Sequence, residues 1–202
     1  SKPSDLGYSD DGFSLPPVRV HTHFVDVDYT PTDQLFFTGL KGVGDRAKVR
    51  RMTIDDRLDA IAKIVNGGDE QWIIWTGLQK ESSAVAAALS GAVEVKGTDS
   101  IEHKVGAFEA FQDGDIRVLV TKPRIGGFGM NFQNAHKMAF FGLSDSWEAW
   151  YQCIRRQWRY GQAYPVDVHV VLSALEQDIY RNIMRKDAMA RRLRQGMIEL
   201  LR

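Results

Sequence analysis

The stretch YQCIRRQWRYGQ, residues 151–162, sets cationic and amide side chains among aromatic rings and closes on Gly-Gln. Arg156 and Arg159 are three positions apart and Gln152 lies one turn before Arg156, so a helix would present all three on one side. A guanidinium is permanently charged and can donate two hydrogen bonds to phosphate oxygens. The pattern therefore suits contact with a polyphosphate whose charge grows during phosphoryl transfer. A solvated cationic helix is the alternative interpretation, because the same spacing is common on surfaces.

A second candidate is the glycine-rich stretch GGFGMNF, residues 126–132, which follows an apolar run. Gly127 and Gly129 have no side chain, so backbone at these positions could approach a ligand closely. Such loops hold phosphate or ribose, and a plain tight turn is the alternative. The third glycine of G-x-G-x-x-G is missing and Asp145 is poorly placed as a ribose-binding carboxylate, which argues against a dinucleotide-binding enzyme.

Several kinds of site are absent from the sequence. It contains no G-x-x-x-x-G-K-[ST], so this chain has no P-loop with which to hold a triphosphate by itself. Cys153 is the single cysteine, which excludes an intramolecular disulfide. The five histidines are scattered and no C-x-x-C occurs, so we expect no metal site within the chain.

The composition is that of an ordinary globular protein, with 202 residues, 44% hydrophobic content, and 26 basic and 26 acidic side chains. No apolar run approaches the roughly 18 residues of a membrane span, and no signal segment is visible, so we expect a cytoplasmic protein without a membrane partner. The chain opens on Ser-Lys rather than Met, which suggests a segment of a longer protein. Residues 151–202 carry 10 Lys/Arg against 5 Asp/Glu, so the C-terminal end is basic.

Apolar and helical patterns alternate along the chain. Residues 18–27 alternate polar and apolar side chains, which is typical of a half-buried strand. Further strands are predicted at 72–76, 92–96, 116–121, 137–143 and 166–172, separated by helices near 81–89, 100–111 and 147–158, with an earlier helix at 57–68. This order predicts an α/β fold with a mostly parallel sheet of about five core strands and helices on both faces. Ser173 and Glu176 form an S-x-x-E capping box that opens a long C-terminal helix.

These patterns divide the chain into four parts. Residues 1–17 read as a flexible lead-in, 18–68 as a connecting strand and helices, 69–173 as the core domain, and 174–202 as a basic helix. Ligands of parallel sheets collect beyond the carboxyl ends of the strands. We therefore expect the site there, in the residues after 96, after 121 and in the segment that leads to the arginines.

Taken in order, these stretches resemble the C-terminal RecA-like lobe, of the P-loop-NTPase type, of superfamily-two helicases, most closely SWI/SNF-type DNA translocases of bacterial or phage type. The closing motif of that family reads Q-x-x-x-R-x-x-R-x-G-Q, and every fixed place is filled here by the residues Gln152, Arg156, Arg159, Gly161 and Gln162. GGFGMNF resembles the preceding motif, with Asn131 in its place. The resemblance covers roughly residues 15–180.

The resemblance implies a catalytic role for Arg156 and Arg159, which would point at ATP on a first RecA-like lobe that this chain lacks, with Arg159 as the arginine finger. ATP and Mg²⁺ would be held mainly by that lobe. The implied nucleotide-binding residues are Gln152, Gly127, Gly129 and Asn131. The implied contacts to a DNA backbone, duplex or single-stranded, are Gly97, Thr98, Thr121 and Lys122, with RNA left open as the alternative track. The second lobe alone would be inactive.

Two departures from the family pattern stand beside the arginines. The family has an acidic residue and a histidine before the two motif arginines, whereas Arg155 and Trp158 occupy those places here.

A non-catalytic nucleic-acid-binding or regulatory module that retains the fold is the competing hypothesis, and intact motif arginines argue against it. The basic C-terminal helix could lie on DNA, pack on the missing lobe or face solvent.

Overall fold

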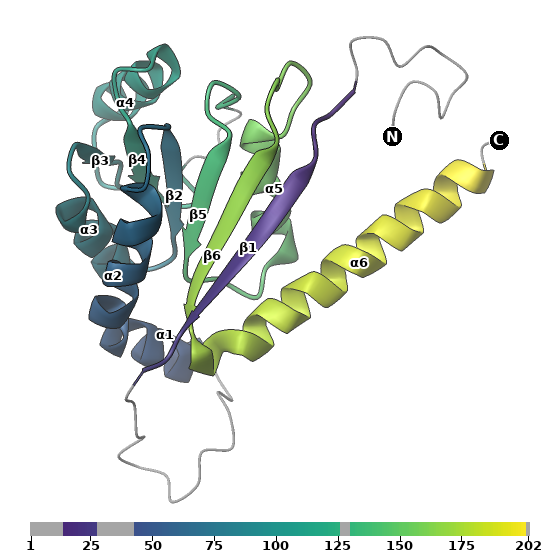
Figure 1. The fold of residues 1–202 in the computed structure, drawn as a ribbon, viewed down its shortest axis with the longest axis horizontal. Coiled ribbons are helices and arrows are strands. Elements are labelled where there is room, and N and C mark those ends of the chain that lie inside the picture. The colour runs from purple at the N-terminus through teal and green to yellow at the C-terminus, as the bar shows by residue number, and fades with distance from the viewer. Residues whose placement is uncertain (1–13, 28–42, 126–129, 201–202) are drawn as a thin grey trace, which may run out of the picture.

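The computed structural model describes residues 14–27, 43–125 and 130–200, and these form one sheet of six parallel strands in the order β1-β6-β5-β2-β4-β3 (Figure 1). The strands are β1 (Val18–Val25), β2 (Trp72–Thr76), β3 (Ala92–Glu94), β4 (Val118–Thr121), β5 (Lys137–Phe141) and β6 (Val166–Ser173). The helices are α1 (Val43–Met52), α2 (Ile54–Val65), α3 (Gln79–Ala88), α4 (Ile101–Asp113), α5 (Trp147–Gln157) and α6 (Gln177–Leu200), with a short 3₁₀ turn, η2 (Ala174–Glu176). The predicted α/β fold is confirmed.

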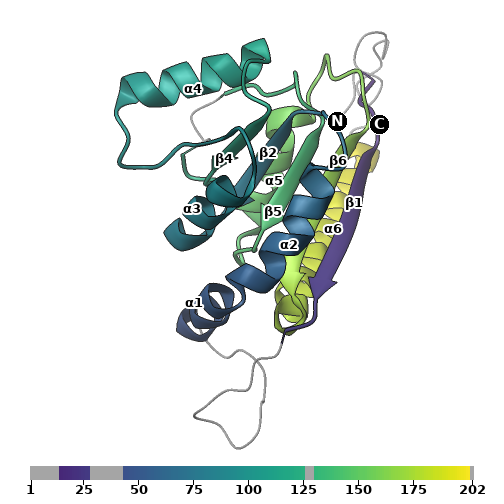
Figure 2. The same ribbon diagram turned by 60° about the vertical axis from the view of Figure 1, so that its left-hand side comes forward.

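Helices cover both faces of the sheet, which explains why β2 is a continuous apolar run. Ile73 and Trp75 face a core that they share with α4, α5 and the start of α6. Trp72 and Ile74 face a second core that they share with α2 and α3. Figure 2 shows α2 and α3 on one side of the strands and α5 and α6 on the other. A parallel strand between two helical layers has no solvent face, so alternation of polar residues disappears.

Strand β1 is an edge strand of this same sheet. It pairs with β6 along its whole length, from Val18 opposite Val166 to Val25 opposite Ser173. The other side of β1 has no strand partner in the described sheet, and four consecutive residues, 19–22, are exposed. The segment that enters β1 therefore lies directly beside the segment that enters β6.

Helix α1, which the sequence pattern did not predict, is held by buried charges at the carboxyl ends of β2 and β5. Arg50 donates to both carboxylate oxygens of Glu81, and Arg57 of α2 donates to Oε1 of Glu81 at 3.1 Å. Gly77 and Gly142 leave room for this cluster, because a Cβ on either would overlap the guanidinium of Arg50. The absence of side chains there has a packing reason within the chain.

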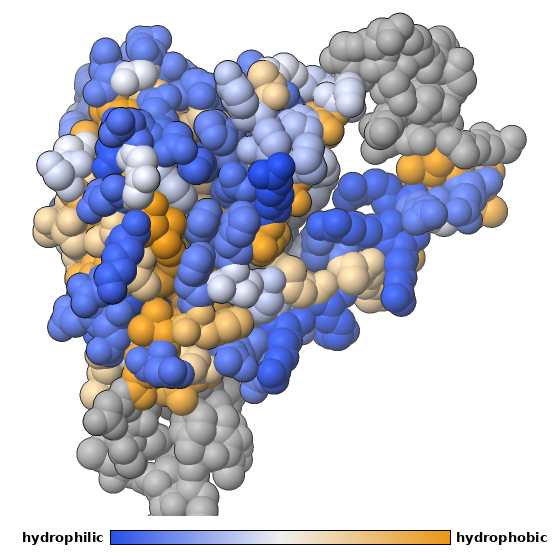
Figure 3. Space-filling view, in the orientation of Figure 1, coloured by the Kyte–Doolittle hydropathy of each residue, from blue (hydrophilic) through white to orange (hydrophobic). Residues whose placement is uncertain are grey.

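The long helix α6 starts on the body and then leaves it. The predicted capping box is present, since Oε2 of Glu176 accepts the backbone N–H of Ser173 at 3.2 Å. Ile179 and Ile183 are buried, whereas the second half exposes apolar residues up to Leu200, and Figure 3 shows apolar surface at that far end. Within the residues described, no helix is both long enough and apolar enough to cross a bilayer.

Candidate functional site

Helix α5 carries the arginine motif across the sheet. Ser146 caps its first turn by accepting the N–H of Ala149 at 3.1 Å, just after the carboxyl end of β5. At the other end, Nε2 of Gln157 donates to the carbonyl of Lys137, the first residue of β5, at 3.0 Å. The 11 residues of α5 span about 16 Å at 1.5 Å each, so the helix runs back along the whole strand.

The segment that leads to the arginines was predicted at the carboxyl ends of the strands, and Ser144 and Ser146, which lead into α5, lie there. Arg156 itself lies at the amino end of β5, because α5 is antiparallel to the strand that precedes it. The start of α5 lies at the carboxyl ends of the strands, and its last residues lie at their amino ends.

The helix also ends at Gln157, two residues before Arg159, so it does not carry both arginines. Trp158 is its C-cap, with φ −84° and ψ 81°, so Arg159 lies in the following turn rather than on the helical face of Arg156. Gly161 has φ +93°, a left-handed conformation that favours glycine. The indole Nε1 of Trp158 donates to the carbonyl of Pro16 at 2.7 Å, which holds the chain in this turned path. Tertiary contact thus overrides the expected i, i+3 arrangement on one helix.

The side chain of Gln162 anchors the turn that carries Arg159. It is buried, and its Nε2 donates to the carbonyls of Gln133 and Ala135 at 3.0 Å and to that of Gln157 at 3.3 Å. Its Oε1 accepts the N–H of Tyr164 at 3.0 Å. The last residue of the motif is therefore a structural anchor that ties the arginine turn to the start of β5.

The two sequence motifs meet at the end of α5. Phe132 donates its backbone N–H to the carbonyl of Arg156 at 2.9 Å, and Nη1 of Arg156 lies 3.5 Å from the carbonyl of Met130. Oδ1 of Asn131 accepts the N–H of Gln133 at 3.2 Å and so stabilises a turn. Gly127 and Gly129, which were also predicted to border the nucleotide, lie outside the described residues.

Arg159 has the most available charge in this group. Its side chain is partly exposed, and its guanidinium makes no hydrogen bond or ion pair in the described part of the chain. Gln152 is exposed, with Nε2 donating to Oε1 of Glu148 at 3.0 Å. A guanidinium held on an ordered turn without a carboxylate partner is suited to an incoming phosphate.

The predicted nucleic-acid contacts lie at the carboxyl ends of the neighbouring strands β3 and β4, opposite the end where Arg156 lies. Gly97 and Thr98 follow β3 and are exposed, and a Cβ on Gly97 would meet no atom within 4 Å. Lys122 follows β4, which pairs with β3. Thr121 differs from the other three, because it is fully buried and its hydroxyl donates to the carbonyl of Val95 at 3.2 Å. Its side chain therefore joins the two strand ends instead of facing a ligand.

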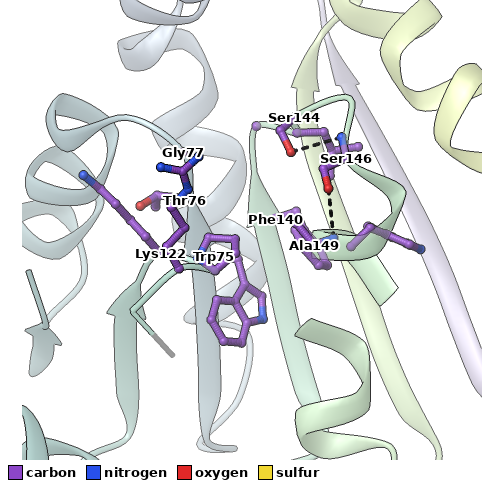
Figure 4. A pocket seen from close by; sticks show the side chains of 13 residues that line it. Trp75, Thr76, Gly77, Lys122, Phe140, Ser144, Ser146 and Ala149 are labelled. Carbon is purple, nitrogen blue, oxygen red and sulfur yellow. Dashed lines mark hydrogen bonds between the residues drawn. The ribbon is translucent and has the colours of Figure 1, made fainter. Parts of the chain in front are cut away.

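A cavity of about 560 Å³ opens at the same edge. Its lining residues come from the ends of β2, β4 and β5 and the start of α5, and include Trp75, Lys122, Arg124, Ser144 and Ser146. Figure 4 shows Lys122 and the two serines on opposite sides, with the aromatic side chains between them. Nζ of Lys122 donates to Oε1 of Gln79 at 2.9 Å. Ser144 and Ser146 were not among the site residues predicted from the sequence, although a Ser-Asp-Ser run before an amphipathic helix is an N-cap signal.

Comparisons with known proteins identify the family of this chain. Residues 56–161, more than half of the chain, match the family model described as the helicase conserved C-terminal domain. Helicase swr1 of Aspergillus fumigatus is 28% identical over 148 residues, which cover 71% of this chain. The bifunctional helicase and thymine dioxygenase JBP2 of Leishmania braziliensis is 34% identical over 100 residues, or 47% of the chain. The matched regions make up 9% of each of these relatives.

Two solved structures share the fold. The C-terminal part of the Fun30 ATPase domain aligns with a TM-score of 0.57 at 20% identity, covering 63% of this chain and 45% of that one. The yeast DEAD-box splicing factor Prp28 aligns with a TM-score of 0.60 at 13% identity, covering 85% and 34%. The six-stranded parallel sheet is thus a RecA-like fold, and the chain belongs to the helicase conserved C-terminal domain family.

Proposed function

We propose that this chain is the second motor lobe of an ATP-dependent DNA helicase or translocase of the SWI/SNF type. In this proposal it works with a first RecA-like lobe that holds ATP and Mg²⁺. Arg155 and Trp158, which depart from the chromatin-type pattern, favour a bacterial or phage member, although the relatives named above are eukaryotic. Relatives that are named helicases support the motor role in general, and the arginine turn supports this chain's part in it.

The observation that carries the proposal is the state of Arg159. Its guanidinium stands without a polar partner in the described structure, on a turn whose backbone is held by Gln162 beneath it. Such a group pays little reorganisation energy when it donates to the oxygens of a phosphate, since the turn is already ordered. ATP with Mg²⁺ would supply the phosphoryl group and its developing charge. Arg156, at the end of α5 beside the same turn, would also donate to the phosphate.

The opposite edge of the sheet supports contact with a nucleic-acid backbone. Gly97 and Thr98 are exposed, and Lys122 and Arg124 add positive charge beside a cavity. Backbone amides and cations are the groups that bind phosphates without reading sequence. Thr121 would contribute by holding β3 and β4 in register. Helix α5 connects the two edges, so a change at one end can shift the other.

The direct test is ATP hydrolysis by the protein with both lobes present, measured with and without duplex DNA, single-stranded DNA and RNA. We expect nucleic acid to stimulate hydrolysis and Arg159→Ala to lower kcat by roughly a thousandfold or more while ATP still binds. Arg19→Ala is the matched control, because Arg19 is an exposed arginine on β1. Its hydrolysis should equal that of the wild type.

Two results would overturn the proposal. A wild-type protein without stimulated hydrolysis would instead fit a non-catalytic nucleic-acid-binding module. An active protein that tolerates Arg159→Ala would show that the guanidinium does not act on the phosphate. The most effective activator among the three nucleic acids would identify the track.

A further inference from the structure

Trp158 joins the arginine turn to the chain that enters the domain. Its indole Nε1 donates to the carbonyl of Pro16 at 2.7 Å, across 142 positions of sequence. The next residue, Pro17, accepts the backbone N–H of Val166 at 3.0 Å. The segment before β1 is therefore bonded on one side to the residue preceding Arg159 and on the other to the start of β6.

The residues on both sides of this bond are stiff. Proline fixes its own φ near −65° and restricts the residue before it, so Pro16 and Pro17 form a rigid lead into β1. The ring of Trp158 packs against the core, and Cζ of Arg155 lies 5.2 Å from its centre. A shift of the lead-in segment would thus move Trp158 as a unit instead of being absorbed by a flexible side chain.

The same residue decides where the helix stops. The N–H of Trp158 still bonds to the carbonyl of Ile154 at 2.9 Å, which completes the last helical turn, but its ψ of 81° then directs the chain out of the helix. Arg159 follows immediately. The direction in which the Arg159 guanidinium leaves the domain therefore depends on the backbone conformation of Trp158, which the Pro16 hydrogen bond holds.

We propose that Trp158 is a positioning residue that ties the orientation of Arg159 to the segment 14–17. This inference rests on the proposed function, in which Arg159 acts on phosphate. In the proposed two-lobed motor, closure of the lobes would displace the segment 14–17, because it leads into this lobe. The hydrogen bond between Trp158 and Pro16 would transmit that movement to the turn that carries Arg159. The family that this chain resembles has histidine at the position of Trp158.

Trp158→Phe tests the tie, because it keeps an aromatic ring beside Arg155 and removes the indole N–H. Trp147→Phe is the matched control: Trp147 is the first residue of α5, Trp158 is the C-cap of the same helix, and Nε1 of Trp147 donates to Oδ1 of Asp187 at 3.0 Å. Each variant loses one part-buried indole hydrogen bond, so their thermal stabilities should fall by similar amounts. A difference between them then reports position and not general weakening.

Two readouts are measured on the full-length protein. Amide hydrogen exchange should accelerate at least tenfold at residues 159–162 and at Val166 in Trp158→Phe, and at neither in Trp147→Phe. For ATP hydrolysis, kcat should fall roughly tenfold in Trp158→Phe with KM for ATP within twofold of wild type, because orientation of the guanidinium is lost and not ground-state binding. Trp147→Phe should keep both constants.

The outcomes separate this inference from the proposed function. If wild type hydrolyses ATP but Trp158→Phe matches the control in exchange or in kcat, Trp158 does not position Arg159 and the proposed function stands. If wild type shows no hydrolysis, the proposed function fails and the positioning role fails with it, whatever the exchange rates.

Discussion

The backbone N–H of Gln162 donates to the carbonyl of Arg159 at 3.1 Å, and the side chain of Gln162 is buried under the same turn. The residue with the available guanidinium and the residue that anchors it are thus directly bonded. Both are fixed places of one sequence motif. Their roles differ in the structure, because Arg159 is partly exposed whereas the side chain of Gln162 holds the backbone against the start of β5.

The first prediction concerns this anchor. Gln162→Glu keeps the shape of the side chain but replaces its donor amide with a carboxylate that faces three carbonyl oxygens. Loss of a buried donor leaves these acceptors unsatisfied, so we expect the free energy of unfolding to fall by about 2–3 kcal/mol at pH 8. Urea unfolding measures it. Gln195→Glu, at an exposed position of α6, should change stability by less than about 0.5 kcal/mol.

The second prediction uses Gly97, where nothing within the chain requires a glycine. A Cβ there would meet no atom within 4 Å and its φ is not positive, so Gly97→Ala should fold with wild-type stability. If a nucleic-acid backbone lies against this residue, the added methyl should weaken DNA binding about fivefold or more in a fluorescence anisotropy titration. Gly106→Ala on α4 is the control, because it has equal space and should leave binding unchanged. Equal affinities for both variants would remove Gly97 from the interface.

The third prediction concerns the buried charges that hold α1. Glu81 is fully buried and accepts from Arg50 and Arg57 as well as from the N–H of Leu78 at 3.0 Å. Glu81→Gln would leave two buried guanidiniums without their shared carboxylate, and we expect about 3–5 kcal/mol of lost stability. Chemical denaturation checks this value. Glu109→Gln at an exposed position of α4 should be close to neutral, and a similarly small effect at Glu81 would mean that the cluster does not hold the fold.

The fourth prediction is a pH dependence at the edge of the sheet. Burial lowers the pKa of His169 to about 4, with smaller contributions from His21, whose ring is stacked at 4.6 Å, and from His23, whose Nε2 lies 3.0 Å from Nδ1 of His169. Asp167 opposes this shift and Lys137 adds to it. The unfolded chain, with a histidine pKa near 6.5, therefore binds a proton that the folded chain resists.

The sign follows from this difference. The contribution of His169 to the free energy of unfolding is fully present above about pH 6.5. It falls as the pH decreases towards 4, because the unfolded state takes up the proton first. His169 is partly exposed, so solvent screening limits the loss to about 1–2 kcal/mol. Urea midpoints between pH 4 and 8 measure it. His169→Gln should make the profile shallower, although burial also lowers the pKa of His23 and His136 and so keeps part of the slope. His103→Gln, on exposed α4, should leave the slope intact, and a flat wild-type profile would refute the expectation.

Much of the fold could be predicted because its strands are short apolar runs set between helices. All six strands appear where the sequence indicated them, and the Ser173 capping box is present, although it caps the 3₁₀ turn η2 directly before the last helix. Helix α1 could not be predicted in this way. Its inward face carries Val49 and the buried cation Arg50 instead of an apolar stripe, and the carboxylate that compensates Arg50 lies 31 positions further along the chain.

The sequence by itself determined the family motif, the alternation of strands and helices, and the absence of a P-loop, because each depends on residue types at short spacing. Only the tertiary structure decided that Arg159 leaves the helix, that Gln162 is buried, and that the arginines and Lys122 lie at opposite edges of the sheet. These features depend on bonds such as that between Trp158 and Pro16, 142 residues apart. A contact of that separation leaves no periodic signal, since it exists only once the strands between its partners have paired.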